Sequence, residues 1–475
     1  MQEISALELA ARPKVILNLL GSLLGALSAL CVVPAGVAFG CGDGEPALAF
    51  AAVALVTGAI GYGLRRLQPT RSIQRNEALV VTAAIFVLAA VVMTPPLLAY
   101  GLSARDAFFE AVSGVTTTGL TTLRRVQDMP DSFVFARAWM QWFGGLGIVA
   151  LTIVFVLEPG IAVRQLGGEA NDSPSESTRH RARRILVAYL ALTSFGILVL
   201  WVLGLRPFDA VNIAMASVST GGFAPHDDSI AAFQSPTVHM AVMGLSFLGA
   251  LPLPLYLALH HRRIPWSRFW EVPALLVFGV VASLLIAMLQ PAGNSFEQAL
   301  FLGFSAQSTT GFSLGTTDIG AAASLVVVVS MLTGGCVAST AGGVKMLRTL
   351  ILARVLRWQV QSTHLPPDAV AAPRLRGERL DAGEIQQALV IVLLFVGVVL
   401  ASWWAFLLAG HDPVDALFEV ASATGTVGLS SGITAPDLSL GLRSVLCADM
   451  LLGRLEVIAF LVLVAPSTWL GRKAT

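Results

Sequence analysis

Charged residues are scarce in this chain of 475 residues. They make up only 12% of the sequence, whereas hydrophobic residues account for 55% and the mean hydropathy is +0.77. A soluble domain carries about 25% charged residues, and a water-facing fold cannot hide so much apolar surface. The composition therefore predicts an integral membrane protein. The net charge of +1 says little by itself, and we expect no nucleic-acid partner.

Cysteines and catalytic sets are also missing. The four cysteines are too few for a disulfide framework and lack metal-ligand spacing, so they are interpreted as apolar filler. The apolar segments contain no paired aspartates, no His-Glu-x-x-His and no Ser with Lys. The "GGLG" at 144–147 lacks the strand context of a phosphate loop. We therefore expect neither an enzyme nor a bound cofactor.

Long apolar stretches are abundant instead. Ten are long enough to cross about 30 Å of hydrocarbon as helices, and the last ones are long enough to be tilted or interrupted. They lie near 15–39, 46–64, 78–101, 135–158, 184–205, 238–259, 271–290, 322–356, 385–409 and 440–470. The N-terminal "MQEISALELAARPKV" is acidic and has no cleavage site, which predicts a cytoplasmic helix before a retained span.

Most of the 30 basic residues fall in alternate connections. These connections include "RHRARR" at 179–184, "HHRRIPWSR" at 260–268 and the segment from Lys345 to Arg379. The positive-inside bias makes that side cytoplasmic and places both termini there. The same segments lie where lipid headgroups are expected.

Four of the other connections repeat one pattern. They read "DAFFEAVSGVTTTGL" (106–120), "DAVNIAMASVSTGGF" (209–223), "QALFLGFSAQSTTGF" (298–312) and "DALFEVASATGTVGL" (415–429). A polar residue suited to capping a short helix opens each one, and a glycine follows thirteen positions later. Four matches at one spacing indicate internal repetition, so each repeat is expected to be a helix, a re-entrant loop and a helix.

Each loop ends in small and hydroxyl residues that leave the short helix as extended chain. Non-helical backbone at membrane depth survives only when it is buried in protein or lines a water-filled path. Four such loops around one axis would present carbonyls that replace the hydration shell of a cation. Glycine reaches the positive-φ conformations this requires. The alternative is that these small residues are helix-packing motifs. Four loops with the same spacing make this alternative the weaker one.

These residues resemble the Trk/Ktr/HKT superfamily of potassium transporters, most closely its bacterial TrkH-type membrane subunit. The resemblance runs from about residue 78 to the end and rests on "TTTGL", "STGGFAPHD", "STTGF", "GTVGL", "GGCVASTAGGVKMLR" (334–348) and "LLGRLE" (451–456). It implies an all-α polytopic membrane protein with four helix–pore-loop–helix repeats in pseudo-fourfold arrangement plus two N-terminal transmembrane helices. The implied units are 1–77, then 78–165, 183–262, 268–357 and 383–475.

The resemblance also implies a potassium-binding filter and a gate. The filter residues are Thr116, Thr117, Thr118, Gly119, Ser219, Thr220, Gly221, Gly222, Ser308, Thr309, Thr310, Gly311, Gly425, Thr426, Val427 and Gly428, and potassium is the only metal expected there. Glycine at all four filter positions favours potassium, since a serine at the first accompanies sodium permeation in this family.

The segment "LTGGCVASTAGGVK" carries Gly334, Gly335, Gly342 and Gly343, each costing a helix about 1 kcal/mol against Ala. We expect a broken helix whose middle is a flexible loop below the filter, although close packing through small residues is the alternative. In the resembled family this loop is a gate, and Lys345 would mark its cytoplasmic end.

Arg454 lies inside an apolar run, where a charge is costly unless it is paired or faces a hydrated cavity. An ion pair with Asp449 or Glu456 is one interpretation. By resemblance, the arginine projects into the pore beneath the filter and opposes cation passage.

Three smaller features complete the predictions. Glu110 and Glu419 occupy matching places and are expected either to brace the filter backbone or to make simple buried contacts. "PHDDS" (225–229) is interpreted as an acidic outer mouth rather than a metal site. "FLGALPLPLY" (247–256) lacks the double glycine of "FGGLG" in the fourth span, so the inner cavity of the second repeat is expected to differ.

The predicted function is potassium uptake across the bacterial cytoplasmic membrane through a gated, carbonyl-lined filter. The alternative is a sodium- or proton-coupled cation carrier of low selectivity, although inverted repeats and midplane acids, which favour coupled carriers, are not evident. The resemblance implies a homodimer and a cytosolic nucleotide-binding regulatory subunit, a TrkA-like ring. This chain has no nucleotide-binding motif, so any control by a nucleotide is expected to come from that separate chain.

Overall fold

The computed structural model describes residues 10–67, 73–151, 174–256, 269–291, 293–315, 319–364, 366, 372–375 and 378–470. Several basic residues that fix the predicted orientation lie outside the described residues. They include Arg71, Arg164, the whole of 260–268, Arg376, Arg472 and Lys473. Helix α7 covers 174–182, but only its backbone is described there.

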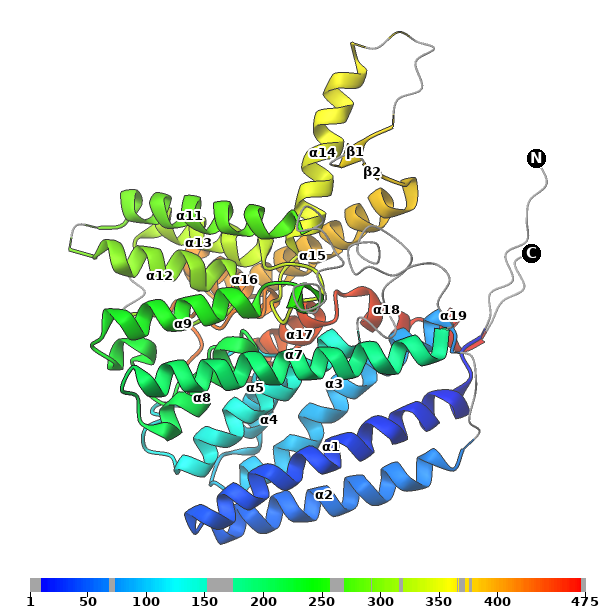
Figure 1. Ribbon diagram of the computed structural model, residues 1–475, viewed down its shortest axis with the longest axis vertical. Helices are drawn as coiled ribbons and strands as arrows, with labels where there is room; N and C mark the ends of the chain where they lie inside the picture. The colour runs from blue at the N-terminus through cyan, green and yellow to red at the C-terminus, as the bar shows by residue number, and fades with distance from the viewer. Residues whose placement is uncertain are drawn as a thin grey trace.

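The fold is an all-α polytopic membrane protein made of two N-terminal helices and four helix–pore-loop–helix repeats (Figure 1). The N-terminal pair is α1 (Pro13–Cys41) and α2 (Gly44–Arg65). The repeats are α3–α4–α5 (Arg75–Leu98, Ala104–Val115, Asp131–Leu151), α7–α8–α9 (Pro174–Val202, Pro207–Val218, Pro236–Gly249), α11–α12–α13 (Glu271–Leu289, Phe296–Gln307, Ala321–Thr333) and α15–α16–α17 (Ala382–Leu408, Pro413–Thr424, Leu440–Arg454).

Within the described chain, six further elements link or extend the repeats. A 3-10 turn, η2 (Ser229–Ala232), follows the second pore loop, and α14 (Met346–Ser362) rises from the bundle beside a short hairpin (Figure 1). The hairpin pairs β1 (Arg374–Leu375) with β2 (Glu378–Arg379) in antiparallel register. After α17 come two short helices, α18 (Ile458–Val464) and α19 (Pro466–Leu470).

Within the described chain the ten predicted spans are not all full-length helices, and the expected interruptions are present. Six helices of the described chain are long and apolar enough to cross a membrane, namely α1, α2, α3, α11, α15 and the part of α7 from Arg183. The second helices of the last three repeats, α9, α13 and α17, are only 13–15 residues long. The predicted spans 322–356 and 440–470 are each interrupted, because a glycine-rich loop follows α13 and a tight turn follows α17.

The four pore helices begin earlier than the repeat pattern suggests. Each is 12 residues long, and its predicted cap is the third helical residue rather than the cap itself. In the third repeat Ser295 precedes the helix and accepts from the backbone N–H of Gln298, while Gln298 accepts from the backbone of Ser295. Such a reciprocal pair satisfies two free N–H groups at once, so Gln298 still helps to fix the start of this pore helix.

The N-terminal helices pack closely against each other along one edge of the bundle (Figure 1). Gly21 and Gly61 meet where a Cβ on either would lie under 3.0 Å from the other helix's backbone. Small residues of this kind let membrane helices approach through their backbones. The pair is tied to α3 by Arg12, whose Nε and Nη2 donate to Glu77 at 2.6 and 2.8 Å.

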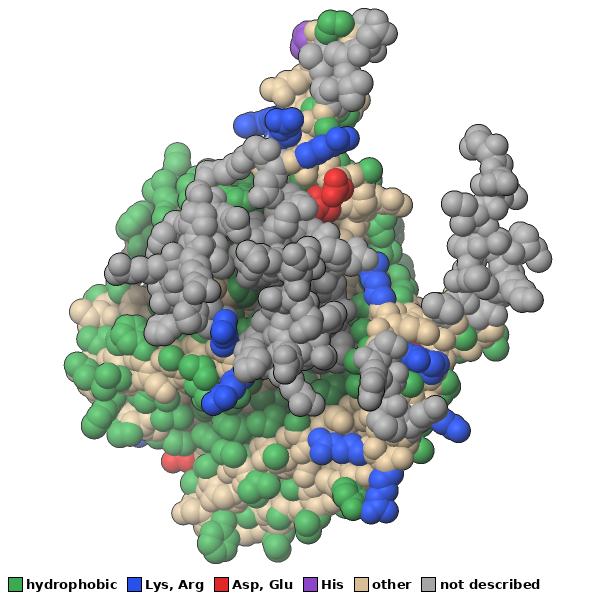
Figure 2. Space-filling model, turned by 45° about the vertical axis from the view of Figure 1, so that its right-hand side comes forward, with side chains coloured by type: hydrophobic (Ala, Val, Ile, Leu, Met, Phe, Trp, Pro, Cys, Tyr) green, Lys and Arg blue, Asp and Glu red, His purple; other side chains and the backbone are tan. Residues whose placement is uncertain are grey.

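Apolar side chains are widely distributed over the described part of the surface (Figure 2). Many large apolar side chains are exposed on the outer helices. Examples are Leu55 on α2, Trp201 on α7, Met288 on α11 and Leu408 on α15. A water-soluble protein rarely exposes patches of this extent. This surface suits lipid, in agreement with a multi-pass membrane protein.

Candidate functional site: four pore loops and the segment beneath them

The four loops that follow the pore helices share one backbone conformation. After each helix comes a right-handed residue, then a threonine with positive φ: Thr117 (56°), Thr220 (52°), Thr309 (54°) and Thr426 (50°). A β-branched residue at positive φ is a genuine outlier. Such outliers persist only where the surroundings impose them, and they cluster at functional sites. No local pattern in the amino-acid sequence indicates this strain.

Two positions further on, each loop has the glycine of the repeat. Gly119, Gly222, Gly311 and Gly428 have φ between 77° and 98°, which confirms the expectation that glycine is needed for its positive φ. All four glycines are partly buried, whereas the residue directly before each of them is buried.

The glycines also close the loops into a ring. A Cβ on Gly119 would lie under 3.0 Å from the carbonyl oxygen of Gly221 in the second loop. In the same way Gly222 meets Thr310 of the third loop, Gly311 meets Val427 of the fourth, and Gly428 meets Thr118 of the first. Each loop therefore touches the next in chain order, and the fourth touches the first. The structure thus brings all four predicted loops together around one axis.

Side chains behind the ring hold the loop backbone in place. In the first loop Gly119 donates its N–H to Ser113 Oγ at 3.0 Å, and in the fourth Gly428 does the same to Ser422. The second repeat has Ala216 at this position. There Gln141 of α5 holds the backbone on either side of Gly222 instead: its Nε2 donates to the carbonyl of Gly221 and its Oε1 accepts from Phe223 N–H at 3.1 Å. Sequence reasoning missed Gln141, and the missing serine was the only signal.

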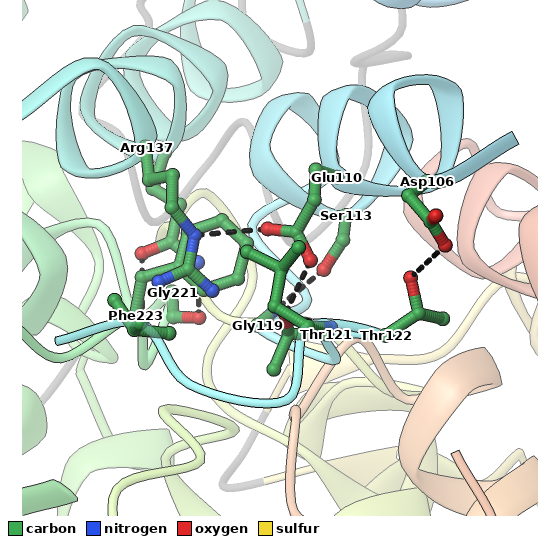
Figure 3. A network of polar contacts seen from close by, with 12 residues as sticks. Asp106, Glu110, Ser113, Gly119, Thr121, Thr122, Arg137, Gly221 and Phe223 are labelled. Carbon is green, nitrogen blue, oxygen red and sulfur yellow. Dashed lines mark hydrogen bonds and ion pairs between the residues drawn. The ribbon is translucent and has the colours of Figure 1, made fainter. Parts of the chain in front are cut away.

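Glu110 and Glu419 brace the outer ends of the first and fourth loops. Glu110 accepts from Arg137 Nε at 2.9 Å and from the hydroxyl of Thr121 (Figure 3). The Arg137 guanidinium lies 3.7 Å from the ring centre of Phe223, just after the second loop, so it spans two repeats. Glu419 accepts from the backbone N–H groups of Ser431 and Thr434 and from nearby hydroxyls.

In three of the four repeats, a second glycine lets the end of the pore helix come close to the helix that follows the pore loop. A Cβ on Gly144, Gly249 or Gly453 would lie under 3.0 Å from the last helical carbonyl of the neighbouring pore helix, that of Val115, Val218 or Thr424. "FLGALPLPLY" therefore keeps the glycine that makes this approach, Gly249. The change from "FGGLG" falls on Ala250, where α9 ends.

The outer mouth carries acids that are already engaged. Asp106 accepts from Thr122 Oγ1 at 2.9 Å and also binds Arg443 of α17, and Asp227 accepts from the backbone N–H of Val126 at 2.6 Å. Among the residues that the structure describes, no cluster of three or more His, Cys, Asp or Glu could hold a metal ion.

The glycine-rich segment breaks its helix, as predicted. Helix α13 ends at Thr333 and α14 begins at Met346. Between them the chain runs with positive φ at Gly334, Ala338 and Gly343. We call residues 334–345 the inner loop.

The inner loop lies directly against the strained threonines of the ring. Gly342 donates its N–H to Thr309 Oγ1 at 2.7 Å, and Thr340 Oγ1 lies 3.4 Å from Thr220 Oγ1. A Cβ on Gly342 would meet the carbonyl of Gly425 and the hydroxyl of Thr426. Three of the four loops are thus in contact with the inner loop, which occupies the space beneath them.

Arg454 ends α17 and reaches the inner loop from the fourth repeat. Its Nη1 donates to the carbonyl oxygen of Thr340 at 2.7 Å, and the side chain is only 3% exposed. Neither predicted carboxylate pairs with it. Glu456 is held by Arg348, and Asp449 accepts from Ser402 Oγ at 2.6 Å. Within the described chain the Nε and Nη2 of Arg454 have no hydrogen-bond partner.

A cavity opens beneath the ring on the side of Arg454. Its lining includes residues of the inner loop, three basic side chains and one acidic side chain. The charged residues are Arg75, Lys345, Arg454 and Glu456. Lys345 itself donates to the carbonyl of Ala341 and has φ 78° at the start of α14. A ring of backbone carbonyls can hold a dehydrated cation, whereas a buried guanidinium below it opposes cations.

Four matched repeats around a closed ring of loops define a membrane transport protein with a pore in one chain. The family model for TrkH, described as a cation transport protein, matches residues 49–278 and 270–471. The chain belongs to this family.

Curated relatives and a solved structure agree with this assignment. The Trk system potassium uptake protein TrkH of Vibrio parahaemolyticus is 29% identical over 484 residues, which covers 96% of this chain and 99% of the relative. The Trk system potassium uptake protein TrkI of Halomonas elongata is 32% identical over 392 residues and 78% of each chain. The crystal structure of the potassium transporter TrkH from Vibrio parahaemolyticus matches with a TM-score of 0.82 at 25% identity, over 96% of this chain and 99% of that one.

Proposed function

We propose that this protein takes up potassium across the bacterial cytoplasmic membrane through a filter built from its four pore loops. The observation that carries the proposal is the closed ring, in which each loop repeats the same strained threonine and the same glycine contact. The filter residues are the sixteen from Thr116–Gly119, Ser219–Gly222, Ser308–Gly311 and Gly425–Gly428. The names of the relatives, potassium uptake proteins of Trk systems, support the choice of ion.

The inner loop and Arg454 are proposed as the gate. The loop fills the space below the ring, and the Arg454 guanidinium adds a positive charge on the path of the cation. Gly334, Gly335, Gly342 and Gly343 would allow the loop to change shape, and Lys345 ends it. Opening requires the loop to leave Thr309 and Thr220, and Arg454 to leave Thr340.

The surroundings of the transporter follow from the same reasoning. With the basic connections at the cytoplasmic face, both termini lie inside the cell. The units 78–165, 183–262, 268–357 and 383–475 would each supply one quarter of the pore. We propose a homodimer regulated by a separate cytosolic nucleotide-binding ring of the TrkA type, with lipid headgroups around the basic segments.

Cation flux into vesicles tests this function. Purified protein reconstituted in liposomes should carry potassium and rubidium well and sodium and lithium poorly. The matched variant Gly119→Ser alters one glycine of the ring and should admit sodium. Equal potassium and sodium flux in the unmodified protein would instead favour the low-selectivity carrier.

A further inference from the structure

The turn between α17 and α18 is strained and is not explained by the pore alone. Glu456 and Val457 have φ of 56° and 60°, and two consecutive residues other than glycine rarely adopt this conformation. The backbone ladder changes here as well, since Val457 N–H bonds to Leu452 O at 2.9 Å, five residues back, rather than four. We call residues 455–457 the strained turn. It begins directly after Arg454.

One ion pair fastens this turn to another element. Arg348 of α14 holds both carboxylate oxygens of Glu456, with Nη2–Oε2 at 2.5 Å and Nη1–Oε1 at 3.1 Å. The side chains are 14% and 28% exposed. A two-point fork of this kind fixes direction as well as distance, and partial burial limits its screening by salt.

The pair forms the second of two links between the same parts of the chain. Arg454 reaches from α17 to Thr340 of the inner loop, while Arg348, one turn into the helix that follows this loop, reaches back to the strained turn. Only one residue separates Arg454 from Glu456. Helix α14 stands out from the bundle (Figure 1), so its first turn is the point where a displacement of this helix would meet the pore.

We propose that Arg348 and Glu456 are positioning residues that form a latch, which keeps the strained turn left-handed and so holds Arg454 against Thr340. Strain persists only where its surroundings impose it. When Arg348 moves away, residues 455–457 relax toward right-handed helix, α17 runs on toward α18, and Arg454 leaves the inner loop. The inference rests on the proposed gate and adds the element that sets it.

Flux through reconstituted protein tests the latch. Glu456→Gln removes the charge that Arg348 holds, and we expect basal rubidium flux to rise about fivefold or more. Arg348→Lys keeps a positive charge without the fork and should give a smaller rise. The exchanged pair R348E/E456R should return flux toward the basal value. Arg357→Gln is the matched control, because it removes an exposed charge from the same helix and leaves the latch intact.

Combined variants distinguish a latch that acts through Arg454 from a purely structural role of Glu456. In an Arg454→Ala background, Glu456→Gln should change flux less than about twofold, since the latch acts through Arg454. An equal rise with and without Arg454 would overturn the latch, as would unchanged or lower flux in the folded Glu456→Gln protein. If Glu456→Gln does not fold, Arg348→Lys decides by the same comparison.

Different results would overturn the proposed latch and the proposed transport function. Absence of potassium-selective flux in the unmodified protein would overturn the proposed function and the latch with it. A selective unmodified protein whose flux rises with Arg454→Ala but not with the latch variants would overturn the latch alone.

Discussion

Arg454 donates a hydrogen bond from Nη1 to the carbonyl oxygen of Thr340 at 2.7 Å, so a residue of the fourth repeat closes on the inner loop of the third. The bond is buried, and the remaining guanidinium donors have no partner within the described chain. A buried charge with so few partners is expensive. Its position below the ring of pore loops is the basis for its proposed role in the gate.

Replacing this arginine tests the electrostatic gate. Arg454→Ala removes the positive charge and the hydrogen bond to Thr340, so rubidium flux should rise by about tenfold, which corresponds to about 1.4 kcal/mol of barrier. Arg454→Lys keeps the charge and should stay near the basal rate. The measurement is initial flux into vesicles at equal protein content, and unchanged or lower flux in the alanine variant would contradict the barrier.

The glycine contacts of the ring predict a loss of selectivity. In Gly119→Ser the new side chain meets the carbonyl of Gly221, at a backbone φ of 98° that costs a side chain roughly 1–3 kcal/mol. The loops must shift apart, and the ratio of potassium to sodium flux should fall severalfold. Gly147→Ser is the control, since a Cβ there has no atom within 4 Å. Similar ratios in both variants would argue against a tightly closed ring.

Gln141 should matter only because the second repeat lacks a serine. Gln141→Ala leaves the carbonyl of Gly221 and the N–H of Phe223 without their side-chain partner, at a cost of about 1–3 kcal/mol for buried groups. We expect a lower melting temperature together with weaker selectivity. Adding Ala216→Ser should restore part of both, measured by thermal unfolding and by flux. If neither the melting temperature nor the selectivity recovers, a serine at this position does not replace the role of the glutamine.

The Glu110–Arg137 ion pair predicts that substitutions of its two members have non-additive effects on stability. Both side chains are at most 2% exposed, so removing one leaves the other buried and unpaired, which costs about 3–5 kcal/mol. Arg137→Met and Glu110→Gln should each lower the melting temperature clearly. The double variant R137M/E110Q should be less destabilised than the two single losses combined. Additive losses would mean that the two residues do not support each other.

The sequence predicted the architecture because its signals are periodic and repeated. Four copies of one pattern specified the pore helices, and the glycines followed from the need for positive φ. The break at 334–345 followed from clustered glycine, since each one weakens a helix.

Other features depend on contacts between distant residues and left no local signal. The turn after Arg454 contains Glu456 and Val457, neither of which indicates a left-handed backbone. In the proposed latch it is held by a contact with Arg348, 108 residues earlier. In the same way, the partner of Arg454 is a backbone carbonyl, and sequence can suggest carboxylates but not which carbonyl lies within reach. The pore helices begin earlier than expected because, in three of the four repeats, a serine or aspartate three residues before the predicted cap accepts from the helix N-terminus instead.

The most direct test of the central claim is the position of the ion itself. Crystals of the protein soaked in rubidium should show anomalous scattering on the axis between the four loops, within the ring closed by Gly119, Gly222, Gly311 and Gly428, and Gly119→Ser should weaken it. Rubidium density that lies only outside this ring, or none in crystals of protein that transports rubidium, would contradict a filter at these loops.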